Sequence, residues 1–75
     1  MRELVLFITK SLVAEPDKVH VTEVQGEDGL ILKVSVASED IGKVIGKQGR
    51  IAKAIRTVVK AASPVDQRIF VEINS

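Results

Sequence analysis

The spacing of apolar residues divides this 75-residue chain into helical and strand-like segments. Apolar residues recur at helical spacing from Glu3 to about Ala14. The sequence Glu15-Pro16-Asp17 then predicts the end of that helix, because proline lacks a backbone donor and restricts the residue before it. Residues Val19–Gln25 and Leu30–Ala37 are rich in β-branched residues and largely alternate apolar with polar positions, which predicts two strands.

The second half of the chain predicts two helices and a third strand. A short helix is expected over Ser38–Ile45, with the serine as its N-cap and with Glu39 and Asp40 near the positive end of its dipole. A longer helix runs from about Arg50 to Ala62, and a strand covers Arg68–Asn74. The predicted core stripe of the longer helix consists of Ile51, Ile55, Val58, Val59 and Ala62.

These segments predict one domain over residues 1–75 with the order α-β-β-α-α-β. Four residues join the first two strands, so that these strands are expected to form an antiparallel hairpin. The second and third strands are joined through two helices and can lie parallel by a right-handed crossover. The sequence therefore predicts an α+β fold, a three-stranded mixed sheet with all three helices on one face.

The composition excludes several classes of protein. The chain has no cysteine and one histidine, His20, so it lacks the residues of a disulfide framework, a thiolate metal site or a nucleophilic catalytic site. Its acidic residues fall at predicted turns and helix starts, where capping accounts for them. The sequence therefore predicts neither an enzyme nor a bound cofactor. No window approaches the roughly 18 apolar residues of a membrane span, and a cytoplasmic protein is expected.

Positive charge is concentrated in one segment of the chain. This basic segment, from Lys43 to Lys60, contains six basic residues and no acidic residue, whereas the rest of the chain holds five basic and all ten acidic residues. Its basic residues are Lys43, Lys47, Arg50, Lys53, Arg56 and Lys60. A positive patch on an otherwise acidic body indicates binding of an anion, most often a nucleic-acid backbone. A solvated helix face is the alternative interpretation.

The two aromatic residues, Phe7 and Phe70, lie outside this basic segment. With so few aromatic residues the chain cannot form a base-stacking platform of the RRM or OB type. Aliphatic side chains bind bases less tightly than stacked rings, so one domain is expected to bind nucleic acid weakly and to gain from a partner. The apolar excess of the first helix fits such a partner, whereas Phe7 itself is expected in the core.

Two stretches share the pattern glycine, two residues, glycine. GEDG at Gly26–Gly29 lies between two strands and carries two acids, which predicts a hairpin turn and disfavours an anion. GKQG at Gly46–Gly49 lies between two helices within the basic segment. A glycine-rich turn that opens a helix leaves backbone amides free and lets a phosphate approach closely. The alternative is a tight connection that merely needs two glycines.

The segment IGKVIGKQGRIAKAI, from Ile41 to Ile55, resembles the signature of K-homology (KH) domains, V-I-G-x-x-G-x-x-I with a basic GxxG loop. The predicted order of elements resembles the type II, prokaryotic arrangement of that fold. The resemblance covers essentially the whole chain. The chain is similar to bacterial single-domain KH proteins of the KhpA-like type.

The resemblance implies that the chain binds single-stranded RNA. KH domains hold about four nucleotides through the GxxG loop, which here consists of Gly46, Lys47, Gln48 and Gly49. Lys43, Arg50 and Lys53 would add phosphate contacts. The family's aliphatic positions, which divide between core and groove floor, correspond here to Ile41, Val44, Ile45 and Ile51.

Two roles are compatible with this resemblance. One is an RNA chaperone or post-transcriptional regulator that forms a homodimer, or a heterodimer with another KH-containing protein. The alternative is a protein–protein scaffold subunit for which RNA contact is incidental.

Overall fold

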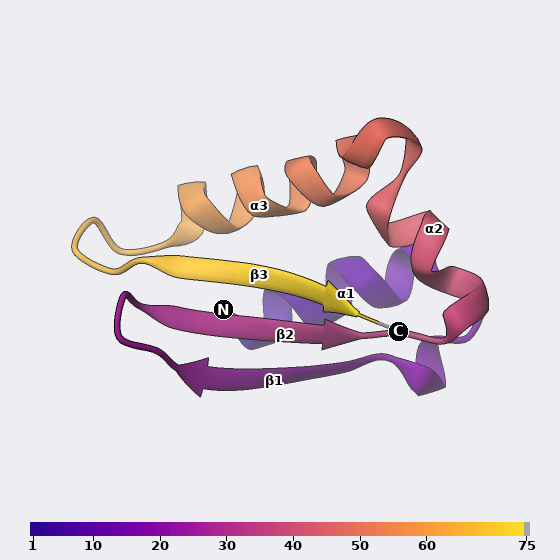
Figure 1. Cartoon of the computed structure of the whole chain (residues 1–75), viewed down its shortest axis with the longest axis horizontal. Coiled ribbons are helices and arrows are strands. Elements are labelled where there is room, and N and C mark those ends of the chain that lie inside the picture. The colour runs from indigo at the N-terminus through magenta and orange to yellow at the C-terminus, as the bar shows by residue number, and fades with distance from the viewer. Residues whose placement is uncertain (75) are drawn as a thin grey trace.

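All six expected elements form, in the predicted order. The computed structural model describes residues 1–74 (Figure 1). Its helices are α1 (Arg2–Leu12), α2 (Ile41–Ile45) and α3 (Arg50–Ala62), and its strands are β1 (His20–Gln25), β2 (Leu30–Ser35) and β3 (Ile69–Asn74). Short 3-10 turns occupy Pro16–Lys18, Ser38–Asp40 and Lys47–Gly49.

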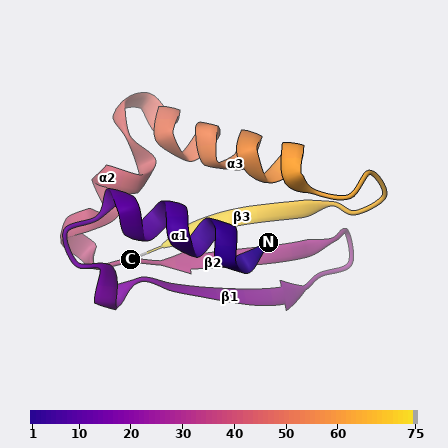
Figure 2. The same ribbon diagram turned by 180° about the vertical axis from the view of Figure 1, so that it is seen from behind.

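The strands form one mixed sheet in the order β1-β2-β3. β1 runs antiparallel to β2, and β2 runs parallel to β3, which follows it through α2 and α3. α1 lies across one face of the sheet, and α3 runs beside β3, as the two opposite views show (Figures 1 and 2). The predicted α+β fold is confirmed.

One hydrophobic core lies between the helices and the sheet. Its fully buried side chains come from all three helices and from the central strand: Val5 of α1, Val44 of α2, Val59 of α3, and Leu32 and Val34 of β2. Successive side chains of a strand point to opposite faces. Ile31 and its neighbours across the ladder, Val24 and Phe70, therefore lie on the open face of the sheet.

The buried stripe of α3 differs from the predicted one. Ala52, Ile55 and Val59 are buried, whereas Val58 is 43% exposed and Ala62 is also exposed. α3 runs beside the edge strand β3 rather than over the middle of the sheet (Figure 1), so that only a narrow stripe of the helix meets the core. The prediction that Val58 and Ala62 belong to the core is wrong.

Phe7 is exposed as well, contrary to the expectation that it lies in the core. The buried residues of α1 are Val5 and Thr9, which are four residues apart and face the sheet together. A residue two positions after Val5 points roughly 200° away around the helix. Phe7 therefore faces outward and is 71% exposed.

GEDG forms the expected hairpin turn. The Gly26 amide donates to the Gly29 carbonyl at 2.8 Å and closes the loop between β1 and β2. A Cβ at Gly29 would overlap the carbonyl of Arg68, because the turn packs against the start of β3. The second glycine of this pair is therefore required by packing.

Asp40 has a structural role that its predicted place in the first turn of a helix does not suggest. The residue is 1% exposed, and its carboxylate accepts hydrogen bonds from the amides of Ala14 at 3.1 Å and Glu15 at 3.0 Å. Its Oδ1 also lies 3.2 Å from the Lys43 ammonium. Asp40 thus ties the chain that leaves α1 to the start of α2.

Ser38 does not cap α2, contrary to prediction. It begins a 3-10 turn, and its hydroxyl donates to the neighbouring Glu39 carboxylate at 2.7 Å, which lowers the pKa of Glu39. α2 begins after Asp40, whose side chain makes no cap hydrogen bond because it is engaged by the segment after α1.

Asp40 is expected to make stability depend on pH below neutrality. Burial alone would raise the pKa of its carboxyl, but the amides of Ala14 and Glu15 and the Lys43 ammonium outweigh burial and hold that pKa below its ordinary value. The stabilisation is then fully present above the unfolded-state pKa of about 3.9 and is lost as the pH falls through the folded-state pKa.

The Asp40→Asn variant removes this titration. We expect it to be less stable than the wild type at neutral pH and to lose less stability on acidification, because its side chain cannot ionise. Urea unfolding between neutral pH and about pH 3 measures both effects, with the exposed Asp17→Asn as the matched control. Equal acid losses in the wild type and in Asp40→Asn would contradict the role given to this carboxylate.

Candidate nucleic-acid interface

The GKQG loop joins α2 to α3 with an unusual backbone. Gly46 has φ 77° and ψ 173°, Gln48 has φ 58° and ψ 25°, and Gly49 has φ 73° and ψ 15°. Within residues 1–74, Gln48 is the only residue other than glycine with a positive φ. Such strain in a side-chain-bearing residue is uncommon and is concentrated at functional sites.

The loop leaves backbone amides free. The amide of Gly46 donates to the Gly42 carbonyl at 2.9 Å, and that of Gly49 donates to the Gly46 carbonyl at 3.1 Å. Within the part of the chain that the structure describes, the amides of Lys47 and Gln48 have no such acceptor. α3 begins directly after the loop without a side-chain cap, and the amide of Arg50, its first residue, donates to the Lys47 carbonyl within the loop.

The two glycines of the loop are required for different reasons. A Cβ at Gly46 would lie 2.6 Å from the side chain of Ile51, at a φ that side chains rarely tolerate. A Cβ at Gly49 would meet only open space, so this glycine is required by its left-handed conformation alone. The last aliphatic position of the signature falls on the buried Ala52, and Ile51 is instead the residue that packs against Gly46.

The basic side chains around the loop are exposed. The side chain of Lys43 is 52% exposed although it pairs with Asp40, and Arg50 donates to the Gln48 side-chain carbonyl at 3.3 Å. Lys47 and Lys53 are exposed, and neither forms an ion pair with any other residue of the range 1–74. All of them lie on the loop or within one turn of the helices that flank it.

The four aliphatic residues expected beside the loop divide between core and surface. Val44 is fully buried in the hydrophobic core because α2 directs this side chain at the sheet, so of the two expected places, core and groove floor, it occupies the core. Ile41, Ile45 and Ile51 are half-buried and leave part of their apolar surface beside the loop.

A groove between α3 and β3 was not predicted from the sequence. Its volume is about 710 Å³, compared with about 410 Å³ for a smaller hollow on the open face of the sheet at the hairpin. Arg56 and Lys60 line it from α3, Arg68 from the turn before β3, and Phe70 from the strand. Among residues 1–74, no acidic residue lines it. The groove therefore extends the positive surface along α3, away from the loop.

Arg56 is held in this groove by the edge of the sheet. Its Nε and Nη2 donate to the Val71 carbonyl at 3.3 and 3.2 Å. The sequence places Arg56 in the basic segment but does not associate Arg68 and Phe70 with it, because the turn after α3 separates them from that segment. One feature of the sequence could have indicated their position. The crossover connection brings β3 back next to α3, so residues at the start of β3 lie near those of α3.

The described residues give little indication of a metal site, a catalytic histidine or a membrane-spanning helix. Within residues 1–74 no group of three His, Cys, Asp or Glu side chains could hold a metal ion. His20 is exposed on β1, opposite Ser35. None of the helices in this described part of the chain is both long and apolar enough to cross a membrane.

Comparison with known proteins gives consistent matches over nearly the whole chain. The model of the family described as KhpA/KhpB, KH domain matches residues 2–73. A protein of Clostridium perfringens named RNA-binding protein KhpA is 62% identical over 74 residues, which cover 97% of this chain and 99% of the relative. Proteins of the same name from Listeria monocytogenes and Chlamydia trachomatis are 53% and 47% identical, over 97% of this chain and 97% and 95% of theirs. No solved structure matches.

The geometry of the loop predicts a contrast between two glycines. Gly46→Ala is expected to lower the free energy of unfolding by about 1–3 kcal/mol, because the residue would be strained and would overlap Ile51. Gly42→Ala is the matched control, since its Cβ enters open space within α2, and it should leave stability unchanged or raise it by about 0.5–1 kcal/mol. Urea unfolding measures both. Equal stability of the two variants would contradict the role of Gly46.

Proposed function

Because the chain belongs to the KhpA/KhpB family of KH domains, we propose that it binds short stretches of single-stranded RNA through the GKQG loop. The observation that carries this proposal is the loop itself, where the free amides of Lys47 and Gln48 lie in an acid-free, positively charged segment. The element order, which is consistent with the type II KH fold, supports it. The names of the matched proteins describe RNA binding and no reaction, in agreement with a protein that is not an enzyme.

The loop would bind the sugar-phosphate backbone. Gly46 and Gly49 allow close approach, the amides of Lys47 and Gln48 donate to phosphate oxygens, and the dipole of α3 adds to the attraction. Lys47 is the nearest free ammonium, because it lies inside the loop. Arg50 and Lys53 follow on α3 and contribute charge to the next phosphates.

Bases would lie against the aliphatic surface beside the loop. Ile41 and Ile45 of α2 keep part of their side chains exposed there, as does Ile51 of α3. Lys43 contributes charge, although its ammonium is shared with Asp40. This arrangement provides more contact with the backbone than with base edges, so modest sequence preference is expected.

A weak, sequence-tolerant RNA contact suits a cytoplasmic RNA chaperone or post-transcriptional regulator. Such a protein gains affinity when a second binding module is joined to it. We propose a homodimer, or a heterodimer with another KH-containing protein, as the source of the second module. The exposed apolar residues Phe7 and Leu12 of α1 and Val58 of α3 support this proposal, because α1 and α3 cover the same side of the sheet (Figure 2).

The loop assignment predicts a loss of RNA binding in one double variant. Lys47→Asp with Gln48→Asp should abolish binding at protein concentrations that saturate the wild type, because two carboxylates would face the phosphates. Aspartate tolerates the left-handed conformation of position 48, so the thermal transition should change little. The control Glu27→Ser with Asp28→Ser alters the other glycine pair and should bind RNA as well as the wild type or slightly better.

Fluorescence anisotropy with a labelled oligoadenylate measures these affinities. In the wild type, the logarithm of affinity should fall with the logarithm of salt concentration by about 0.7 per phosphate neutralised. Retention of binding by the aspartate variant would contradict the loop assignment. No RNA binding by the wild type even at low salt would favour the scaffold alternative.

The dimer proposal predicts a change of mass in solution. Phe7→Ser should shift the sedimentation equilibrium of the protein from dimer toward monomer, because it removes an exposed ring that only a partner would cover. Val24→Ser, on the open face of the sheet, is the control and should leave the mass unchanged. A wild type that sediments as a monomer at all accessible concentrations would contradict a homodimer.

A further inference from the structure

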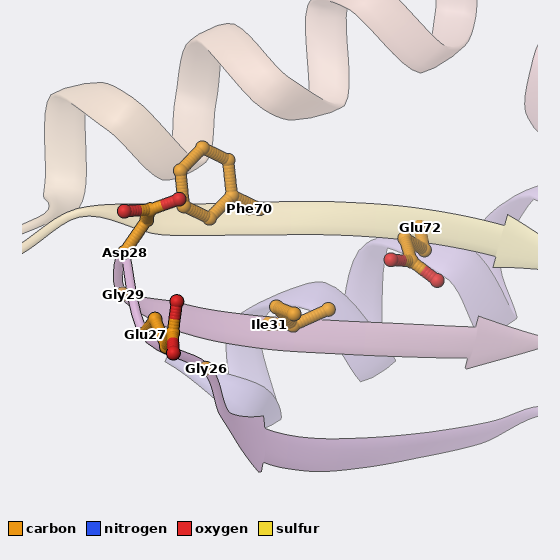
Figure 3. A pocket seen from close by; sticks show the side chains of 7 residues that line it. All are labelled: Gly26, Glu27, Asp28, Gly29, Ile31, Phe70 and Glu72. Atoms are coloured by element: carbon orange, nitrogen blue, oxygen red, sulfur yellow. The ribbon is translucent and has the colours of Figure 1, made fainter.

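A hollow of about 410 Å³ lies on the open face of the sheet, at the GEDG hairpin. In this hairpin hollow, Ile31 of β2 lies between the acids of the turn and Glu72, and Phe70 borders it from β3 (Figure 3). Among the described residues, Phe70 alone lines both this hollow and the groove beside α3. The hairpin hollow is therefore a separate surface on the side of the sheet away from the core.

The apolar part of the hairpin hollow belongs to a row that crosses the whole sheet. Val24, Ile31 and Phe70 are neighbours in register on the three strands and lie on the open face. Val24 is 37% exposed and Phe70 is 44% exposed, although burial would stabilise apolar side chains of this size. The helices of residues 1–74 pack on the core side of the sheet and leave this row uncovered. The row therefore offers apolar surface to a partner.

Three carboxylates surround this apolar surface. Glu27 and Asp28 lie in the turn, and Glu72 lies on the other side of Ile31 (Figure 3). Within residues 1–74 none of the three forms an ion pair, and Lys33, the neighbour of Glu72 across the ladder, does not pair with it. The turn itself is closed by a backbone hydrogen bond between its two glycines and does not use its acids. Like charges around one hollow repel each other, so the carboxylates favour a bound cation.

An arginine side chain has the properties that this hollow would complement. Its aliphatic stem can lie on Ile31, and its planar guanidinium can stack on the ring of Phe70. The guanidinium also presents five donors in a fixed plane, which suits carboxylates on more than one side, whereas a lysine ammonium is a compact point charge. A phosphate backbone would be repelled by the three acids. The surface therefore suits an arginine of a protein rather than RNA.

The hairpin hollow and the GKQG loop lie at opposite ends of the sheet. The hairpin precedes β2, and α2 follows it at the other end (Figure 1). The six residues of β2 separate the two ends by about 20 Å, at roughly 3.3 Å per residue. A ligand in the hairpin hollow would therefore leave the loop free.

We propose that the hairpin hollow is the docking site for an exposed arginine of a partner protein, presented on an extended segment. The guanidinium stacks on Phe70 and donates hydrogen bonds to the carboxylates of Glu27, Asp28 and Glu72. An apolar residue next to the arginine covers Val24. This site does not depend on RNA binding at the loop, so the failure of either proposal leaves the other standing.

Titration with a synthetic peptide tests the site. The probe is a six-residue peptide that alternates arginine and valine and has blocked ends, added to the isotope-labelled protein. The backbone amides of residues 26–29, Ile31 and Glu72 should shift and saturate. The same peptide with citrulline, which keeps the shape of arginine without its charge, should bind about tenfold more weakly or less. A peptide with lysine should also bind more weakly than the arginine peptide.

Two variants of the hairpin hollow test its parts. Glu27→Ser with Asp28→Ser should weaken binding of the arginine peptide by about tenfold. Glu3→Ser with Asp17→Ser is the matched control, since it removes the same charge from α1 and the turn after it, and it should bind the peptide like the wild type. Phe70→Leu should weaken binding by about two- to fivefold through loss of the cation–ring contact. Thermal unfolding near the wild-type temperature would show that each variant remains folded.

The outcomes that overturn the proposal are distinct. Equal affinity for the arginine and citrulline peptides, or equal affinity of the wild type and the Glu27→Ser, Asp28→Ser variant, would show that the carboxylates bind no guanidinium. Shifts of the same amides with rising protein concentration alone would assign the hairpin hollow to a second copy of the chain. Shifts there with an oligoadenylate would assign it to RNA. Either result would overturn docking of a partner's arginine.

Discussion

The carboxylate of Asp40 determines where the loop-bearing part of the molecule sits. α2 has five residues, too few to form a stable helix alone, so its position depends on tertiary contacts. Val44 anchors it in the core, and Asp40 anchors its start to the amides of Ala14 and Glu15. The two amides and the Lys43 ammonium compensate the buried carboxylate, so the loss of a partner would leave its charge less well compensated. Because the GKQG loop follows α2 directly, the position of α2 determines the position of the loop.

A second constraint is the separation of charge over a very small domain. The basic residues from Lys43 to Lys60 occupy α2, the loop and α3, whereas the hairpin at the other end of β2 carries Glu27 and Asp28. The two glycine pairs share a sequence pattern, but GEDG lies in an acidic part of the surface and GKQG in a basic part. One serves a turn that packs on Arg68, and the other exposes amides beside cations. Phe70 lies where the two surfaces meet.

The sequence predicts those features that depend on neighbouring residues. The hairpin, the helix-loop-helix around GKQG and the crossover all follow from local patterns, and all are found. Apart from the N-cap expected at Ser38, the errors concern which side of a helix meets the sheet. Phe7 and Val58 are apolar at plausible helical spacing, yet both are exposed because α1 and α3 present other residues to the core. The role of Asp40 and the groove at Phe70 depend on residues distant in the chain, and no local pattern reveals them.

The central claim is that the GKQG loop, and not some other surface, binds single-stranded RNA. The most direct measurement is a titration of the isotope-labelled protein with a short oligoadenylate, followed by the NMR shifts of its backbone amides. The account predicts the largest shifts at Lys47, Gln48 and Gly49, with smaller ones at the start of α3, and none at Glu27 and Asp28. Shifts that cluster away from the loop, with the amides of Lys47 and Gln48 unchanged at saturation, would contradict it.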